Sequence, residues 1–401
     1  MSTATVAGQP SDTIDGSGFP LGFLATEGAG RPAILGNAPA SDTFVVEARM
    51  LAGHQREGVI KEGANGGSWR LTCDEGKHMK GTDLAPFPLG FFNAGLHSDL
   101  IGRILSLAAD RNIALDDVGI DLQNHYWMTG SFFRGTGEGF AEPATIKVKV
   151  RSGADAANIR KLVNDAAAAS PAHGAMRAAL TNTFALYVNG RRRPVETMTA
   201  SSANDAPDPY QTYSSVPKPH ASNPDGDIIW KTGTTLEGDI TPAPTGTDTK
   251  ILRNIQGHST LANPAGVVET DTVLNLPGMS RFSIRSDERA SGGSGPCGLS
   301  LLSAGIAFCY MTQLGRYIQH MKFDINGVRL VQYSPYSLTS DGSALAGHAG
   351  PVDTHLFLNG HAEEETYERL MHIGARTCYL HAALSSALLS DIAIDLNGKA
   401  I

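Results

Sequence analysis

The chain has 401 residues, 41% hydrophobic and 18% charged, a balance typical of a globular protein with a sizeable core. Its formal net charge of −8 argues against a general nucleic-acid binder, because neutralising phosphates requires clustered Lys and Arg. A chain of this length is expected to form two domains rather than one.

The N-terminal segment predicts no secretory leader, since MSTATVAGQPSDTIDGSGFP lacks a basic start followed by an apolar run. The most apolar window, residues 298–314, contains two serines, a threonine and a glutamine, which favours a buried helix over a membrane span. Four cysteines without a leader indicate a reducing compartment. We therefore expect a cytoplasmic protein whose thiols are core residues or perform chemistry.

Strand and helix patterns alternate in the same way along both halves of the chain. The first half predicts strands at 43–51 and 68–73, a long apolar helix at about 90–110, strands at 113–128 and 142–150, a helix at about 154–168, a short helix after Ser170 and a last strand. The second half predicts a strand within 228–238, a long apolar helix at 299–320, strands at 322–334 and 352–360, a helix at 362–375, a short helix after Cys378 and a last strand. Strands in blocks around helices favour an α+β fold over a doubly wound α/β fold.

Four short segments recur in the same order about half a chain apart. They are Arg49-x-x-x-Gly53-His54 and Arg253-x-x-x-Gly257-His258, Ala94-Gly95 and Ala304-Gly305, Ser170-Pro171-Ala172-His173 and Cys378-Tyr379-Leu380-His381, and YVNGR (187–191) and DLNGK (395–399). A repeat this long indicates paired domains rather than a solenoid. We assign domain 1 to 41–193 and domain 2 to 245–401, joined by a Pro- and Ser-rich linker at 194–244 and preceded by a surface extension at 1–40.

Two cysteines stand at chemically interesting places in the second half. Cys309 lies inside the apolar helix, where a cysteine is often only a small hydrophobic residue. Ser170 followed by Pro171 is typical of a helix N-cap and its first helical residue. Its counterpart Cys378 is therefore expected to begin a helix, where unpaired amides stabilise a thiolate. The two cysteines could approach each other and act as a redox pair.

These features resemble the OsmC/Ohr family of osmotically inducible and organic-hydroperoxide-resistance proteins. The resemblance rests on Ala304-Gly305-x-x-x-Cys309, followed 69 residues later by Cys378, and on the order of elements in both halves. It implies a thiol peroxidase in which Cys309 attacks the peroxide and Cys378 resolves the sulfenic acid as a disulfide. Family members form intertwined homodimers with central helices between the sheets. The resemblance therefore implies two tandem OsmC-like domains that form an intramolecular pseudo-dimer.

The family pattern is incomplete at the residues that assist the first cysteine. The peroxidases carry a Pro-Glu pair about ten residues before that cysteine, and its glutamate orients a catalytic arginine. The corresponding pairs here are Pro88-Leu89 and Gly298-Leu299, so the glutamate is absent from both halves. Arg56 is the nearest match to the arginine and would serve the second half across the interface. Arg316, seven residues after Cys309, is a rival.

The first half lacks both cysteines and is expected to be inactive in redox chemistry. Asp99 and Ser170 stand in their places and, with His173, form a degenerate second site. We expect Asp99 to pair with Arg103 one helical turn later. A sharper alternative groups His97, Asp99 and His173 as a hydrolytic or metal site, but residues 97 and 99 lie on different faces of a helix.

The remaining signals are weaker. Possible pocket residues are His54, His258, His381 and Cys297, with the histidines equally suited to structural hydrogen bonds and Cys297 favoured as a bystander. Cys73 is expected to be a passive thiol on a strand. The segment GTGEGF (135–140) is expected to form a hairpin turn because a strand, not a helix, follows it.

The preferred function is reduction of organic hydroperoxides, with a dithiol reductant for turnover and neither a metal nor another cofactor. One alternative is lyase or hydrolase chemistry on a small organic molecule with Cys309 as nucleophile, and another is non-catalytic binding of a small molecule. No nucleic-acid or membrane partner is expected, and further association between chains is left open.

Overall fold

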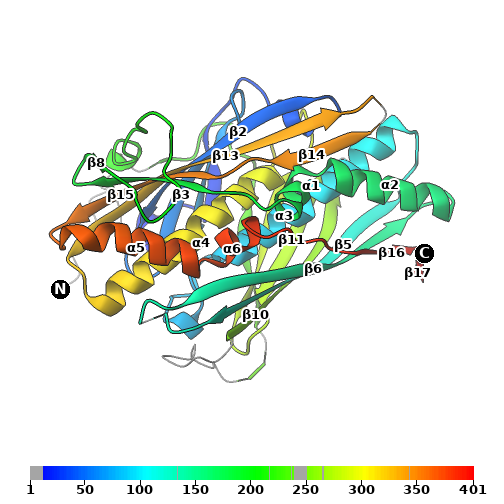
Figure 1. The fold of residues 1–401 in the computed structure, drawn as a ribbon. Coiled ribbons are helices and arrows are strands. Elements are labelled where there is room, and N and C mark those ends of the chain that lie inside the picture. The colour runs from blue at the N-terminus through cyan, green and yellow to red at the C-terminus, as the bar shows by residue number, and fades with distance from the viewer. Residues whose placement is uncertain are drawn as a thin grey trace.

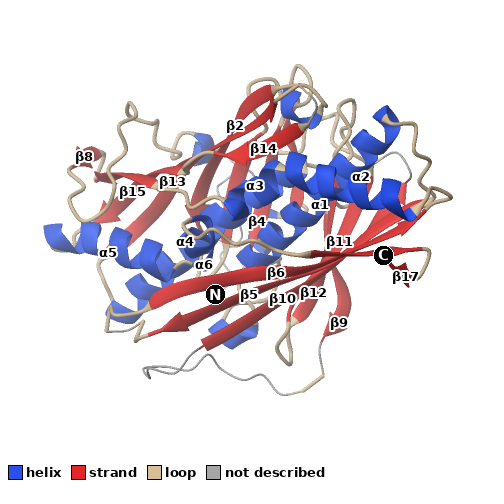
Figure 2. Ribbon diagram, turned by 45° about the vertical axis from the view of Figure 1, so that its right-hand side comes forward, coloured by secondary structure: helices blue, strands red, loops and turns tan. Residues whose placement is uncertain are grey.

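Two β-sheets enclose a pair of long helices in the computed structural model, which describes residues 12–132, 134–215, 217–235, 237–238, 251–263, 266–342 and 344–401. Figures 1 and 2 show one sheet on each side of the helices. The helices α1 (Pro88–Asp110) and α4 (Gly298–Met321) pack on each other, α1 against one sheet and α4 against the other. The predicted α+β class is confirmed.

Both sheets repeat one order of strands. Sheet A runs β1 (Gly22–Thr26), β4 (Ser68–Cys73), β3 (Arg56–Lys61), β2 (Ala40–Met50), β13 (Ile325–Ser340), β15 (Asp353–Gly360), β7 (Thr183–Val188) and β8 (Arg191–Arg193), with β14 (Leu345–Ala349) also paired to β13. Sheet B runs β9 (Ile229–Thr235), β12 (Ser280–Asp287), β11 (Val267–Leu274), β10 (Ile251–Asn263), β5 (Asp117–Thr129), β6 (Glu138–Arg151), β16 (Ile392–Leu396) and β17 (Lys399–Ala400). The named strand pairs are antiparallel apart from β15 with β7 and β16 with β6.

Each sheet contains strands from both halves of the chain. In sheet A, β13 of the second half pairs along ten residues with β2 of the first, with Gln332 opposite Val46. In sheet B, β5 of the first half pairs with β10 of the second, with Gln123 opposite Gln256. Neither half completes a sheet alone, so side chains from both halves meet between the sheets.

The predicted helices are present within a few residues of their expected bounds. Besides α1 and α4 they are α2 (Ala156–Ala169), α3 (Pro171–Arg177), α5 (Glu364–Thr377) and α6 (Tyr379–Leu384), with short 3-10 turns at Asp15–Ser17, Ala33–Leu35, Lys77–Met79 and Thr212–Ser214. Both long helices are buried along most of their length, which explains why they are apolar on all sides. Within the described residues, Gly298–Met321 alone is long and apolar enough to cross a membrane, and its apolar window is wholly inside the protein.

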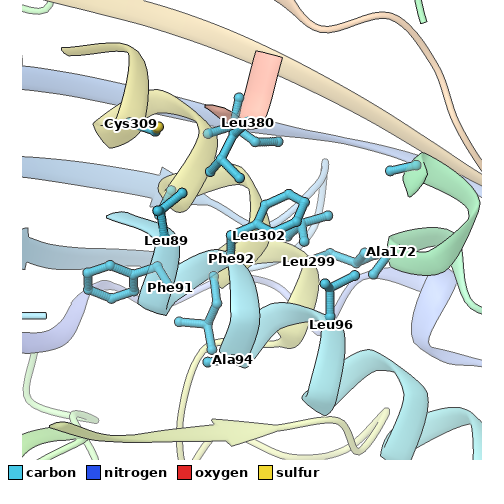
Figure 3. Packing of buried hydrophobic residues seen from close by; sticks show 14 of the residues in the cluster. Leu89, Phe91, Phe92, Ala94, Leu96, Ala172, Leu299, Leu302, Cys309 and Leu380 are labelled. Carbon is cyan, nitrogen blue, oxygen red and sulfur yellow. The ribbon is translucent and has the colours of Figure 1, made fainter. Parts of the chain in front are cut away.

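The repeated Ala-Gly segments bring the backbones of α1 and α4 into contact. A Cβ added to Gly305 would lie 2.7 Å from the backbone nitrogen of Phe92, and one added to Gly95 would lie 2.7 Å from the carbonyl oxygen of Gly298. Figure 3 shows Phe92 and Leu302 among the side chains packed around this crossing. Only glycine leaves room for the two helices at this distance.

The segments outside the two predicted domains are more ordered than expected. Residues 22–26 form β1 at the edge of sheet A, and Phe23 is fully buried, so the prediction of a surface extension is wrong for this part. In the linker, Tyr213 is buried and donates a 2.7 Å hydrogen bond to the carbonyl oxygen of Glu47. The expected strand in 228–238 is confirmed as β9, and the GTGEGF segment turns between β5 and β6 as predicted.

We expect Gly305→Ala to lower the free energy of unfolding by about 1–3 kcal/mol, because the added methyl group separates α4 from α1. Gly153→Ala is the matched control, since nothing lies within 4 Å of its added Cβ. Urea unfolding followed by far-ultraviolet circular dichroism measures both changes. Equal stability of the two variants would contradict the close helix contact.

Candidate active site

Cys309 and Cys378 lie next to each other between α4 and α6. Cys309 lies in the middle of α4, and Cys378 is the N-cap residue of α6, as its correspondence with Ser170 predicts. The backbone amide of Leu380 lies near the Cys309 sulfur and that of His381 lies near the Cys378 sulfur, and each favours the charged form of its thiol. Figure 3 shows Cys309 and Leu380 on neighbouring elements. Both cysteines are free thiols in this structure.

The two thiols differ in acidity because the surrounding donors favour charge on one of them. Burial raises the pKa of the Cys309 thiol well above its usual value, and the neighbouring Cys378 sulfur raises it further. Burial also raises the pKa of Cys378, but the thiol of Cys309 and the side chain and backbone amide of His381 lower this pKa by more than burial raises it. They hold the pKa of Cys378 well below its ordinary value. Negative charge is therefore favoured on Cys378 rather than on Cys309.

A small cavity of about 50 Å³ gives access to Cys309 but not to Cys378. Its walls combine apolar side chains with a few charged ones. The lining is Glu75, His78, Met79, Phe87, Pro88, Leu89, Met128, Arg253, Leu274, Cys309, Thr312, Gln313, Arg316 and Tyr379. Cys309 is 3% exposed and Cys378 is fully buried behind it, so a molecule in the cavity meets Cys309 first.

Arg316 is the cation of α4 that faces this cavity. It is held by a 2.9 Å hydrogen bond to Gln313 Oε1 and lies 4.2 Å from the ring centre of Phe132. Burial lowers its pKa, while Tyr379 and Glu75 oppose that shift. Between the two arginines proposed from the sequence, Arg316 lines the cavity and Arg56 does not.

Arg56 lies behind the cavity wall, in contact with a carboxylate that sequence reasoning missed. Its Nη1 is 3.9 Å from Glu75 Oε1, and Glu75 also accepts a 2.6 Å hydrogen bond from the hydroxyl of Thr312. Burial raises the pKa of Glu75, and Arg56 opposes that shift. Glu75 therefore provides an acidic group beside Cys309, although both halves lack the Pro-Glu pair.

A further repeat in the sequence could have indicated Glu75. Cys73-Asp74-Glu75 at the end of β4 corresponds to Ser286-Asp287-Glu288 at the end of β12. The two glutamates then occupy equivalent ends of the two sheets. Glu288 lies near Asp99 of the first half, and burial raises its pKa to about 8.

Tyr126 and Arg253 are also absent from the sequence-based set. Tyr126 is buried beside both cysteines, and burial raises the pKa of its hydroxyl well above the usual value. Its hydroxyl has no hydrogen-bond partner among the residues that the structure describes. Arg253, identified in the sequence only as a repeat marker, lines the cavity together with Arg316.

The other candidate pocket residues lie outside this cavity. His54 is buried near Arg56 without lining it, and burial lowers the pKa of His54 to about 4. His258 is on the outer face of sheet B, 2.7 Å from Asp121, so its assignment to the pocket is wrong. Cys297 is the N-cap of α4, about 18 Å along the helix from Cys309, and its assignment to the pocket is wrong as well.

Cys297 and Cys73 are both fully buried thiols whose pKa burial raises well above the usual value. The backbone N–H of Cys297 donates a 2.7 Å hydrogen bond to Glu62. Cys73 lies on β4 against Arg56. Neither sulfur borders the cavity, which agrees with the roles of bystander and passive thiol.

The first half builds the same arrangement with oxygen in place of sulfur. Asp99 accepts hydrogen bonds from the hydroxyl of Ser170 and from the backbone N–H of Ala172, 3.1 Å away. Ser170 Oγ lies 2.9 Å from Nδ1 of His173, as Cys378 lies beside His381. The predicted pair of Asp99 with Arg103 is present at 3.9 Å.

The alternative of a hydrolytic or metal site in the first half does not match this geometry. The His97 ring bonds Ser259 Oγ at 2.8 Å rather than Asp99, and Ser170 rather than a histidine bridges Asp99 and His173. Among the described residues, no group of three or more His, Cys, Asp or Glu side chains is arranged to hold a metal ion.

Comparison with known proteins gives one low-similarity match. No protein-family model and no curated protein matches the sequence. A solved structure that matches is an OsmC-like hydroperoxide resistance protein from Jannaschia sp. CCS1. It is 18% identical over 37% of this chain and 95% of that chain, with a TM-score of 0.26. At this level of similarity the match assigns no role to any residue.

We expect the ultraviolet absorbance of thiolate to show one cysteine that ionises well below the pH of an ordinary thiol, because donors around Cys378 lower its pKa. Acidification through that pKa removes the absorbance. Cys378→Ala should abolish this step, whereas Cys297→Ala should leave it unchanged. Persistence of the step in Cys378→Ala would show that another sulfur carries the charge.

Proposed function

We propose that the protein is a cysteine-based peroxidase that reduces organic hydroperoxides, with Cys309 as the attacking and Cys378 as the resolving cysteine. The observation that supports this most is the contact between the two sulfurs, with only Cys309 open to the cavity. The apolar part of the cavity wall suits the organic group of such a substrate. The resemblance of the sequence to the OsmC/Ohr family agrees with the proposal.

The first step uses the charge distribution of the thiol pair. Cys378 accepts the proton of the neighbouring Cys309, leaving a Cys309 thiolate that the nearby backbone amide of Leu380 stabilises. This thiolate attacks the outer peroxide oxygen; the S–O bond forms as the O–O bond breaks. The departing alkoxide takes up a proton and leaves as the alcohol, and Cys309 becomes a sulfenic acid.

The second step closes the disulfide. The Cys378 sulfur attacks the Cys309 sulfur, an S–S bond forms, and the hydroxyl group leaves with a proton as water. A dithiol then reduces the disulfide through two exchange reactions and is itself oxidised. The lowered pKa of Cys378 makes its sulfur the better leaving group when the dithiol attacks Cys309 from the cavity.

Arg316 has the position needed to stabilise the leaving oxygen. It lies two helical turns after Cys309 and lines the same cavity, where a positive charge lowers the energy of a developing alkoxide. The carboxylate of Glu75 interacts electrostatically with both Arg56 and Arg316, and so limits the repulsion between the two cations. We assign the cationic role to Arg316 and the supporting role to Glu75 and Arg56.

We also propose that the chain is an internal duplication that forms a pseudo-dimer, with domain 1 at 41–193 and domain 2 at 245–401. The identical strand order of the two sheets supports this, as does the equivalent approach of a helix N-terminal amide, Ala172 to Asp99 and Leu380 to Cys309. Domain 1 then contributes Glu75 and Arg56 to the site whose cysteines belong to domain 2. This cross-domain site is the reason the first half is retained without cysteines of its own.

We expect the purified protein to consume cumene hydroperoxide when a dithiol is supplied. Cys309→Ser should lose all consumption, because no sulfur then meets the substrate. Without the dithiol, Cys378→Ser should consume one hydroperoxide per chain and leave a Cys309 sulfenic acid that dimedone traps. Cys297→Ser, whose thiol lies at the other end of α4, should retain wild-type activity. No consumption by the wild-type protein would reject the peroxidase and leave lyase or hydrolase chemistry, or binding alone.

We expect Arg316→Met to lower kcat/KM for the hydroperoxide by about 10²-fold, through loss of charge stabilisation in the transition state. The control is Ser106→Ala on α1, at the position that corresponds to Arg316 in the first half, which should not change kcat/KM. If a folded Arg56→Met variant loses more activity than Arg316→Met, the cationic role belongs to Arg56 instead.

A further inference from the structure

Two arginine side chains line the Cys309 cavity without a carboxylate partner. Arg316 donates its hydrogen bond to the amide oxygen of Gln313. Arg253 donates a 2.8 Å hydrogen bond from Nη1 to the carbonyl oxygen of Leu252. Neither arginine forms an ion pair with any residue that the structure describes.

The remaining acidic and basic side chains of the lining do not balance these two charges. Glu75 is the one acidic side chain of the lining, and its carboxylate makes an ion pair with Arg56, 3.9 Å away behind the wall. Burial, together with the positive charge of Arg253, lowers the pKa of His78 to about 3, so this histidine is neutral. The cavity beside Cys309 therefore has an excess of positive charge.

Arg253 reaches the cavity because of its place on β10. Ile255 and Gly257 are buried on the face of sheet B that meets the helices, whereas Leu252 on the other face is 63% exposed. Side chains alternate between the two faces of a strand, so Arg253 lies on the same face as Ile255 and Gly257. Arg253 and Cys309 therefore face the same bound molecule.

Both positive charges are absent from the half of the chain that lacks the cysteine pair. Arg253 lies opposite Tyr126 of β5 in sheet B, and Asp42 lies opposite Tyr336 of β13 in sheet A. The two tyrosines are equivalent, because the same number of residues separates them as separates the Ala-Gly segments of the long helices. The first half thus has a carboxylate in place of Arg253, and Ser106 in place of the other arginine.

Two guanidinium groups around one small cavity repel each other and lose hydration without gaining a counter-charge. Burial lowers the pKa of Arg316, and the charge of Arg253 contributes to this shift. A carboxylate in the cavity would remove the repulsion and could accept two parallel hydrogen bonds from one guanidinium group. The charge of the cavity thus favours an anionic ligand.

We propose that Arg253 binds a carboxylate of the substrate and so determines which hydroperoxides the enzyme prefers. The proposal rests on the peroxidase of the proposed function and adds its class of substrate, a short organic hydroperoxide that carries a carboxylate. Arg253 takes the carboxylate while Arg316 faces the leaving oxygen, and the thiol chemistry is unchanged. The cavity of about 50 Å³ requires the carboxylate and the peroxide to lie only a few bonds apart.

Two alkylating reagents of the same shape test this charge preference without a peroxide. Iodoacetate and iodoacetamide both alkylate a thiolate, whose sulfur bonds the methylene carbon as iodide leaves. Reduced protein is treated with an equimolar mixture, and mass spectrometry gives the ratio of carboxymethyl to carbamidomethyl groups on Cys309. Both reagents compete for one thiolate, so the ratio reports recognition of charge and not the reactivity of the thiol.

We expect this ratio on folded wild-type protein to exceed the ratio on the same cysteine in urea by about tenfold or more, because a hydrogen-bonded ion pair holds iodoacetate beside the sulfur. Arg253→Met should lower the folded ratio about tenfold. Arg253→Lys, which keeps the charge but loses the planar fork, should give an intermediate ratio. Arg191→Met, at an exposed position of β8 outside the cavity, is the control and should give the wild-type ratio.

A wild-type ratio no higher in the folded than in the unfolded protein would overturn the proposal, and so would an unchanged ratio in Arg253→Met. If Arg253→Met does not fold, Arg253→Gln takes its place, with the same expected loss and the same contrary result.

The preference should also appear in turnover. We compare γ-hydroperoxyisocaproate with γ-hydroperoxyisocaproamide, in which an amide of the same shape replaces the carboxylate. The ratio of kcat/KM for the acid to kcat/KM for the amide should be about tenfold lower in Arg253→Met than in wild type.

The two proposals fail separately. A protein whose Cys309 prefers iodoacetate through Arg253 but that consumes no hydroperoxide retains the anion site and loses the peroxidase. A protein that consumes the acid and the amide with equal kcat/KM, and shows no preference for iodoacetate, retains the peroxidase and loses the role of Arg253.

Discussion

The backbone contact between α1 and α4 at Gly95 and Gly305 sets the geometry on which the other features depend. Each long helix covers one sheet, so the distance between the helices determines the distance between the sheets. Asp99 lies four residues after Gly95, and Cys309 lies four residues after Gly305. The two side chains therefore occupy equivalent positions relative to the helix crossing. The same crossing places the N-terminal backbone amides of α3 and α6 close to these side chains.

Much of this arrangement can be predicted from the sequence because its signals are local or repeated. Apolar periodicity locates the helices, and the match of Cys378 with Ser170 predicts its position as an N-cap. Once the second half is known to contain two apolar helices, the meeting of Cys309 and Cys378 is a reasonable hypothesis. These features are read either from local patterns or from the direct match between the two halves.

The residues that sequence reasoning missed enter the site from the other half or from strands without a recognised motif. Glu75 follows β4 of the first half and reaches Cys309 because the sheet that contains β4 packs against α4 of the second half. Arg253 lies on β10, where its role depends on which face of sheet B borders the helices. Pairings over more than 100 residues have no local signature, so Arg56 and Arg316 could not be ranked before the fold was known.

The pairing of strands from both halves within each sheet has a consequence for how the chain folds. Strand β2 leaves an unpaired edge until β13, almost 300 residues later, lies beside it, and β7 waits likewise for β15. During synthesis the first half therefore exposes two edges of sheet A that its own residues cannot cover. Such late, non-local pairing slows folding and favours aggregation of the incomplete chain. Joining the halves in one polypeptide keeps the missing strands at high local concentration, which two separate chains would lack when dilute.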